Sequence, residues 1–169
     1  MMTDLKTSQT GLKLIKDFES FKAMPYFCQA GKKTIGYGHV ILPKEDSDDG
    51  LKFNGKLLPI TEATALELLA RDCATVELPI NALNLGLSQS QFDAVVSLTF
   101  NIGLQNLKNS TLLKLLLKGS KSAASAQFAV WNKARVLNQK TGQRELTVLP
   151  GLVRRRAAEA KLFSTGVYP

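Results

Sequence analysis

One short region carries most of the structural information in this chain: Glu19-Ser-Phe-Lys-Ala-Met-Pro-Tyr-Phe-Cys28-Gln-Ala-Gly-Lys-Lys-Thr34-Ile-Gly-Tyr-Gly-His39. Glu19 closes an apolar, helix-like segment, and burial there disfavours the charged form of a carboxylic acid. A protonated carboxyl is what a general acid needs before it protonates a glycosidic oxygen. Gly36 and Gly38 allow a short strand to bring its backbone close to a ligand or to another strand. The region therefore predicts a polysaccharide-cleaving site near the beginning of the chain.

The composition and charge are those of a basic globular protein. Its 169 residues suffice for one well-packed unit, and a second independent core is not expected. Hydrophobic residues make up 44% and charged residues 21% of the chain, which is ordinary for a globular protein. The net charge of +8 and the pI of about 9.6 favour an acidic polymer as partner: nucleic acid, an anionic membrane face or an anionic cell wall. Charge alone does not choose among these three.

The cysteines and the N-terminus bear on compartment and cofactors. Cys28 and Cys73 are too few for a disulfide framework. Residues 1–10 contain no apolar run of signal-peptide or membrane-spanning length, so the sequence predicts synthesis in the cytoplasm and another component that lets the chain reach an outside target. A single histidine without a Cys/His cluster argues against a zinc site, and neither a metal nor an organic cofactor is expected.

The first part of the chain predicts a small mixed lobe. Ser8 or Thr10 can cap a helix over about 11–21, and the aromatic and β-branched residues of 23–42 favour a hairpin with its turn at Gly31. The charged run over 43–58, with a strand-like piece at Leu51–Leu57, predicts an exposed loop.

The remainder predicts mostly helices. Thr61 caps a long helix to about Leu78, and Cys73 lies on its apolar stripe, where packing is the expected role. Ser88 and Gln91 form a capping-box pattern that opens an apolar, buried helix through Ile102. The elements expected after it are a stop at Gly103, helices over about 110–118 and 121–131, an irregular polar stretch around Gly142, and a last helix from Pro150-Gly151 to Phe163.

The fold class is therefore α+β, mainly α: a small lobe over about 1–60, a connecting helix over 61–80 and a helical lobe over 81–169. A cleft between two lobes is a usual place for a substrate.

Several separated blocks resemble the phage-type lysozymes, the endolysins of glycoside hydrolase family 24. Besides the Glu19–His39 region, the blocks are Gln91-Phe-Asp-Ala-Val-Val-Ser-Leu-Thr-Phe-Asn-Ile-Gly103, Ser110-Thr-Leu-Leu113, Trp131-Asn-Lys-Ala134 and Leu149-Pro-Gly-Leu-Val-Arg-Arg-Arg-Ala-Ala-Glu159. The resemblance covers nearly the whole chain from about residue 10. It implies that residues 1–169 form one lysozyme-like catalytic domain that hydrolyses the β-1,4 bond between N-acetylmuramic acid and N-acetylglucosamine.

The resemblance also assigns catalytic roles by position. Glu19 falls on the family's general acid, and Thr34 falls on the threonine that helps to hold the attacking water. Cys28 falls where most members carry an aspartate and some carry a cysteine. An aspartate there orients water or stabilises a cationic sugar, whereas a free thiol is mostly neutral unless its surroundings favour the thiolate. Cys28 as water-positioner and Cys28 as nucleophile, and hence the inverting and the retaining outcome, both remain open at this point.

His39, the single histidine, allows two interpretations. Because Cys28 is near it in sequence, a Cys–His nucleophilic pair is one of them. The resemblance instead implies that His39 pairs structurally with Asp72 on the long helix. It further implies, from the closing segment Phe163–Tyr168, that Arg155 contacts the catalytic glutamate.

The resemblance names cleft-lining residues and partners as well. The positions that match the cleft are Val40, Phe100, Asn101 and Thr111, with ordinary packing an equal alternative for Val40 and Phe100. The implied partners are peptidoglycan, an anionic bacterial envelope and a holin that opens the membrane. The basic segment Arg154–Arg156 is expected to assist contact with the envelope. A monomer without a nucleic-acid partner is expected. Two rival functions remain: a peptidoglycan peptidase or amidase that uses Cys28 and His39, and a nucleic-acid-binding module that uses Arg154–Arg156. The second lacks a basic stripe interleaved with exposed aromatic residues.

Overall fold

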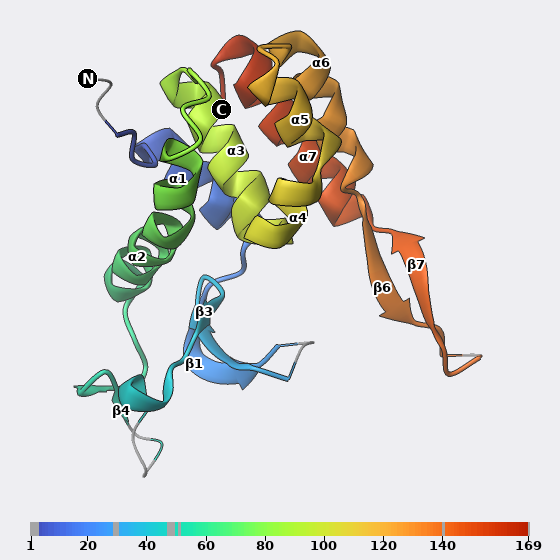
Figure 1. Cartoon of the computed structure of the whole chain (residues 1–169). Helices are drawn as coiled ribbons and strands as arrows, with labels where there is room; N and C mark the ends of the chain where they lie inside the picture. The colour runs from blue at the N-terminus through green and yellow to red at the C-terminus, as the bar shows by residue number, and fades with distance from the viewer. Residues whose placement is uncertain (1–3, 29–30, 47–49, 51, 140, 169) are drawn as a thin grey trace. The chain divides into compact units, whose positions relative to one another are not determined.

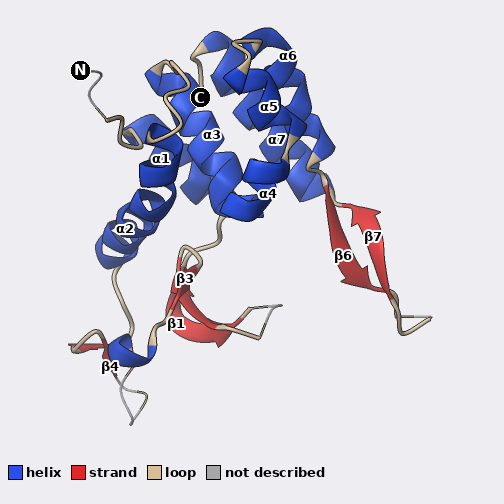
Figure 2. Cartoon of the chain, in the orientation of Figure 1, coloured by secondary structure: helices blue, strands red, loops and turns tan. Residues whose placement is uncertain are grey.

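The computed structural model describes residues 4–28, 31–46, 50, 52–139 and 141–168 (Figure 1). The chain divides into two compact units: a mixed unit, Ile15–Thr75, and a helical unit, Met1–Leu14 with Val76–Pro169. Figure 2 shows that helices predominate, and the described strands form three small sheets. Among the described residues, no helix combines the length and the apolar character needed to cross a bilayer.

Helix α1 covers Gln9–Phe18, so the helix predicted over 11–21 is present but starts and ends earlier. Ser8 is its cap, because the Ser8 hydroxyl oxygen accepts the Gly11 N–H at 3.3 Å. Thr10, the other predicted cap, lies inside the helix. The helix delivers Glu19 directly after its last turn.

The hairpin predicted at Gly31 is confirmed. The strands β1 (Lys22–Phe27), β2 (Lys33–Gly36) and β3 (His39–Val40) form one antiparallel sheet in that order. The Gly31 N–H donates to the Cys28 carbonyl at 2.8 Å, and Gly31 has φ +73°, a conformation that glycine adopts without steric cost. Gln29 and Ala30 lie outside the described residues.

The segment predicted as an exposed loop over 43–58 is only partly exposed. It contains a short 3₁₀ helix, η1 (Pro43–Glu45), and a two-stranded ribbon of β4 (Lys52–Phe53) and β5 (Lys56–Leu57). The prediction is wrong for Glu45 and Phe53, which are 3% and 2% exposed. The ion partners His39 and Arg71 allow Glu45 to be buried. Residues 47–49 and Leu51, the first residue of the predicted strand, lie outside the described residues.

Helix α2 covers Glu62–Asn81, a little longer than predicted. Thr61 caps it as expected, since the Thr61 hydroxyl oxygen accepts the Thr64 N–H at 3.1 Å. Cys73 on its apolar stripe is fully buried, which confirms the expected packing role.

The helical unit is organised around α3 (Gln89–Ile102). Ser88 and Gln91 form the predicted capping box: the Ser88 hydroxyl oxygen accepts the Gln91 N–H, and the Gln91 side-chain oxygen accepts the Ser88 N–H. Residues 92–99 are all buried, as predicted for a central helix. Around it the unit contains α4 (Leu104–Asn109), α5 (Thr111–Leu117), α6 (Lys121–Ala126), η2 (Gln127–Val130) and α7 (Pro150–Thr165). The short helix α4 was not predicted, because Gly103 separates it from α3 by a single residue.

The stretch predicted to be irregular around Gly142 is a β-hairpin. Its strands are β6 (Lys133–Leu137) and β7 (Arg144–Val148), paired in antiparallel register (Figure 2). The prediction is wrong because backbone hydrogen bonds hold this hairpin, while nearly all of its side chains are exposed.

Candidate active site

Glu19 follows α1 as a continuation of its last turn. Its N–H donates to the carbonyls of Ile15 and Lys16 at 3.1 and 3.2 Å, which holds the backbone, and its side chain is half-buried. A Cβ atom placed on Gly38 would lie 3.8 Å from Glu19 Oε2, and Gly38 has φ +89°. The turn between β2 and β3 therefore brings its backbone beside the Glu19 carboxyl group.

Cys28 and Thr34 are tied to one backbone atom. The Cys28 N–H donates to the Lys32 carbonyl oxygen at 3.0 Å, and the Thr34 hydroxyl donates to the same oxygen at 2.9 Å. Thr34 is buried and Cys28 is half-buried. The single Thr34 hydroxyl proton is donated to the Lys32 carbonyl oxygen. The Thr34 oxygen therefore keeps lone pairs that can accept a hydrogen bond from water.

Tyr26 links these residues to Glu19. It lies opposite Thr34 in the β1–β2 register. Burial raises the pKa of Tyr26, and the negative charges of Glu19 and Cys28 add to that rise. Tyr26 and Thr34 are thus paired across the β1–β2 hairpin, and the charge of Glu19 acts on Tyr26.

His39 is buried and lies within a cluster of charged side chains, of which Glu45 is buried, Asp72 is partly exposed and Arg71 is exposed. Its Nδ1 lies 2.8 Å from Asp72 Oδ2, and its Nε2 lies 3.0 Å from Glu45 Oε2. Arg71 Nη2 lies 2.5 Å from the other oxygen of Glu45. The expected His39–Asp72 pair is therefore present, within a larger cluster that joins β3, η1 and α2.

The cluster changes the titration of its members. Burial by itself lowers the pKa of His39, but the hydrogen bonds to Asp72 and Glu45 outweigh burial and raise that pKa above its usual value of 6.5. Burial likewise raises the pKa of Glu45, and hydrogen bonds from Leu42, His39 and Arg71 overcome it, so the pKa falls to about 2. A protonated His39 is thus held between two carboxylates.

This geometry counts against the Cys–His interpretation. Both ring nitrogens of His39 face carboxylates, so neither is open to take a proton from Cys28. Glu45 and Arg71 were missed in the sequence. Arg71 directly precedes Asp72, which is a usable signal, whereas Glu45 is hidden in a run of charges that is typical of surface loops.

Arg155 and Arg156 are buried around Glu159. Their side chains are 3% and 1% exposed, and their Nε atoms lie 3.2 and 2.8 Å from the two Glu159 carboxylate oxygens. The Ser97 hydroxyl donates to Glu159 Oε1 at 2.7 Å. Burial raises the pKa of Glu159, and Arg156, Arg155 and Ser97 oppose that rise.

The basic patch expected at Arg154–Arg156 is therefore wrong: of the three, Arg154 alone is exposed. Buried guanidinium groups paired with a carboxylate offer no surface to a nucleic acid or an envelope. The action of Arg155 on Glu19 stays a prediction.

The four residues predicted to line the cleft are accessible to different degrees. Val40 on β3 is 38% exposed. Phe100 near the end of α3 is half-buried, while Asn101 and Thr111 are exposed. Their contact with substrate stays a prediction.

The family model described as phage lysozyme matches residues 16–159. This chain belongs to the phage lysozyme family. The endolysin of Acyrthosiphon pisum secondary endosymbiont phage 1 is 41% identical over 159 residues, which cover 94% of this chain and 97% of that protein. Membership of this family makes the chain a glycoside hydrolase of the lysozyme type.

Solved structures agree with this assignment. The muramidase domain of SpmX from Asticaccaulis excentricus is 31% identical with a TM-score of 0.78, covering 95% of this chain and 99% of that one. A mutant of P22 lysozyme is also 31% identical, with a TM-score of 0.72, covering 96% of this chain and 99% of that one. The predicted α+β, mainly helical, lysozyme-like fold is therefore confirmed.

Proposed function

We propose that this phage lysozyme family member is an endolysin that hydrolyses the β-1,4 bond between N-acetylmuramic acid and N-acetylglucosamine in peptidoglycan and so lyses bacterial cells. The observation that carries the proposal is the grouping of Glu19, Cys28 and Thr34 around the β1–β2 hairpin, with Gly38 beside the Glu19 carboxyl group. Family membership supplies the reaction class.

Each of the three side chains has a role that fits its position. Glu19 protonates the leaving glycosidic oxygen, which generates an oxocarbenium-like sugar. Thr34 accepts a hydrogen bond from the attacking water and so orients it, because its own hydroxyl proton is donated to the Lys32 carbonyl oxygen. Cys28 helps to place that water or to stabilise the positive sugar. Thr34 and Cys28 keep a fixed spacing, since both are bonded to the same carbonyl oxygen.

Other residues bind the glycan or support the acid. Val40, Phe100, Asn101 and Thr111 contact the polysaccharide, which their partial exposure supports. The His39–Asp72 pair holds β3 against α2. Arg155 helps to hold the Glu19 carboxyl group in the orientation that catalysis needs. Both units together form the single catalytic domain.

The enzyme reaches its substrate in two stages. It accumulates as a monomer in the host cytoplasm and passes through a membrane hole formed by a holin. The net charge of +8 then favours contact with the anionic wall.

Glu19→Gln tests the proposal directly. The amide cannot deliver a proton, so wall lysis should fall by about 10²–10⁴-fold, the usual contribution of general acid–base catalysis. Turbidity clearance on purified wall measures the loss, and mass spectrometry should detect new reducing sugar ends with the wild type. Glu67→Gln, at an exposed position on α2, is the matched control and should keep full activity.

Two outcomes would contradict the proposal. A folded Glu19→Gln protein that clears wall at the wild-type rate would show that Glu19 is not the general acid. New free amines in place of reducing ends would identify a peptidase or amidase.

A further inference from the structure

One face of the β6–β7 hairpin carries three cations, each paired across the two strands with an aliphatic side chain. Successive residues of a strand point to opposite faces, and directly paired residues share a face. The register pairs Lys133 with Val148, Arg135 with Leu146, and Leu137 with Arg144. We call this set of six residues the cationic face; each of its three pairs joins one cation to one aliphatic side chain.

The cationic face is open to solvent. Leu137, Leu146 and Val148 are 48%, 63% and 48% exposed, and the three cations are exposed as well. A soluble protein rarely exposes several aliphatic side chains together without a partner for them. The described hairpin therefore presents an apolar and positively charged surface.

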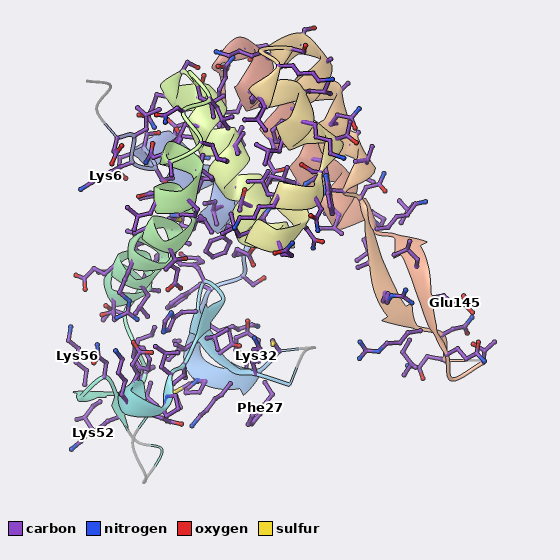
Figure 3. All side chains as sticks on the ribbon, in the orientation of Figure 1. Lys6, Phe27, Lys32, Lys52, Lys56 and Glu145 are labelled. Atoms are coloured by element: carbon purple, nitrogen blue, oxygen red, sulfur yellow. The ribbon has the colours of Figure 1, made fainter. Side chains whose placement is uncertain are left out.

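No negative charge opposes these cations on the described face. The one acidic residue between Lys133 and Val148 is Glu145, which Figure 3 labels on the hairpin. Glu145 pairs with Val136, so it belongs to the opposite face, and Asn138 Nδ2 donates to its carboxylate at 2.9 Å. The three cations are left to attract an external anion.

We propose that the cationic face binds the surface of a lipid bilayer rich in anionic headgroups. Cations attract lipid phosphates, and aliphatic side chains between them enter the apolar layer directly beneath. A wall polysaccharide or a nucleic acid offers anions but no such layer, and the face has no aromatic side chain on which bases could stack. This binding is independent of glycan hydrolysis, and it concentrates the enzyme at the envelope.

Co-sedimentation of the full chain with vesicles tests the proposal. The wild type should bind vesicles of mixed phosphatidylglycerol and phosphatidylcholine and should not bind pure phosphatidylcholine. The double variant Arg135→Gln/Arg144→Gln should lose binding roughly 25-fold, because each cation near an anionic surface contributes about fivefold. Leu146→Ser should weaken the binding that survives high salt, because that part depends on the apolar contact.

A charge-matched control separates the face from net charge. Lys114→Gln/Lys161→Gln removes two exposed cations from α5 and α7 and leaves the hairpin intact, so it should lose much less binding. Circular dichroism verifies that every variant is folded. Equal losses for the two double variants would overturn the proposal. A hairpin variant that loses binding to purified wall and keeps vesicle binding would also overturn it and would assign the face to the wall.

Discussion

At the residue scale, the Lys32 carbonyl oxygen anchors Cys28 and Thr34 through a backbone N–H and a hydroxyl. The Cys28 side chain takes no part in that anchoring bond. It can therefore be replaced without releasing the bond that sets its distance from Thr34. This makes position 28 suitable for separating chemistry from structure.

Cys28→Asp should keep much of the activity, because a carboxylate both orients water and stabilises a cationic sugar. Cys28→Ala should lose on the order of 10²-fold, the lower end of acid–base contributions. A thiol reagent should inhibit the wild type through half-buried Cys28 and spare fully buried Cys73. Wall-lysis rates and peptide mapping measure these effects. Full activity in Cys28→Ala would show that the thiol does no chemistry, and a trapped glycosyl–Cys28 adduct would show that it is the nucleophile.

The raised pKa of His39 makes stability depend on pH. Folding favours the protonated ring, so its contribution is complete below the usual pKa of 6.5 and is lost as pH rises through the higher folded value. His39→Asn should destabilise the protein by ~3–5 kcal/mol at pH 6 and by less at pH 9. Thermal unfolding at both pH values measures the difference, with activity per folded molecule largely retained. An unchanged melting temperature with activity lost would support the Cys–His mechanism instead.

Glu45 acts at the acid end of the range. Its pKa of about 2 lies below the usual 4.5, so its contribution is present above pH 4.5 and is lost as pH falls toward 2. The His39 cluster therefore stabilises the mixed unit most between pH 4.5, above which the contribution of Glu45 is present, and pH 6.5, below which that of His39 is complete.

At the scale of elements, the start of α1 lies very close to α3. A Cβ on Gly11 would lie 2.6 Å from Thr7 Cγ2 and 2.8 Å from Asp93 Cγ. Asp93 is 1% exposed and accepts hydrogen bonds from the Ser8 N–H and from Gln89 Nε2, both at 2.9 Å. The carboxylate cannot move aside without breaking these bonds.

Gly11→Ala should therefore destabilise the fold by about 1–3 kcal/mol, the usual penalty of overpacking. The clash outweighs the higher helix propensity of alanine, which is worth about 1 kcal/mol. Gly151→Ala in α7 is the matched control, since nothing lies within 4 Å of its new Cβ, and it should be neutral or slightly stabilising. Urea unfolding measures both. Equal stability of the two variants would mean that the α1–α3 contact tolerates a methyl group.

At the scale of the whole molecule, the net charge of +8 is not concentrated at the triple arginine. Arg155 and Arg156 pair with Glu159 in the interior, so attraction to the wall depends on the exposed lysines and on exposed arginines such as Arg154, Arg135 and Arg144. Activity on purified wall should fall steadily as salt rises, because the Debye length shrinks from ~8 Å at physiological strength to ~3 Å at 1 M. Circular dichroism at each salt concentration verifies folding. Activity that does not change with salt concentration would show that electrostatic attraction does not contribute to wall lysis.

Much of this protein could be predicted because the decisive signals are local. The Ser88–Gln91 capping box, the Thr61 cap and the Gly31 turn each depend on residues within a few positions, and all three are present. Glu19 was expected at the close of an apolar helical stripe, and it directly follows α1, although the helix was predicted to continue to about residue 21.

Other features depend on partners far away in the chain. Glu45 is buried because Arg71, 26 residues away, reaches it together with the nearer His39. Arg155 is buried because α7 packs so that Glu159 meets Ser97, 62 residues away. A charged residue is buried only when such partners offset its lost hydration. No local sequence pattern shows whether these partners will lie beside it in the folded chain. The sequence thus specifies helix caps and turns and places Glu19 at the end of an apolar helical stripe, whereas long-range packing determines which charges become interior.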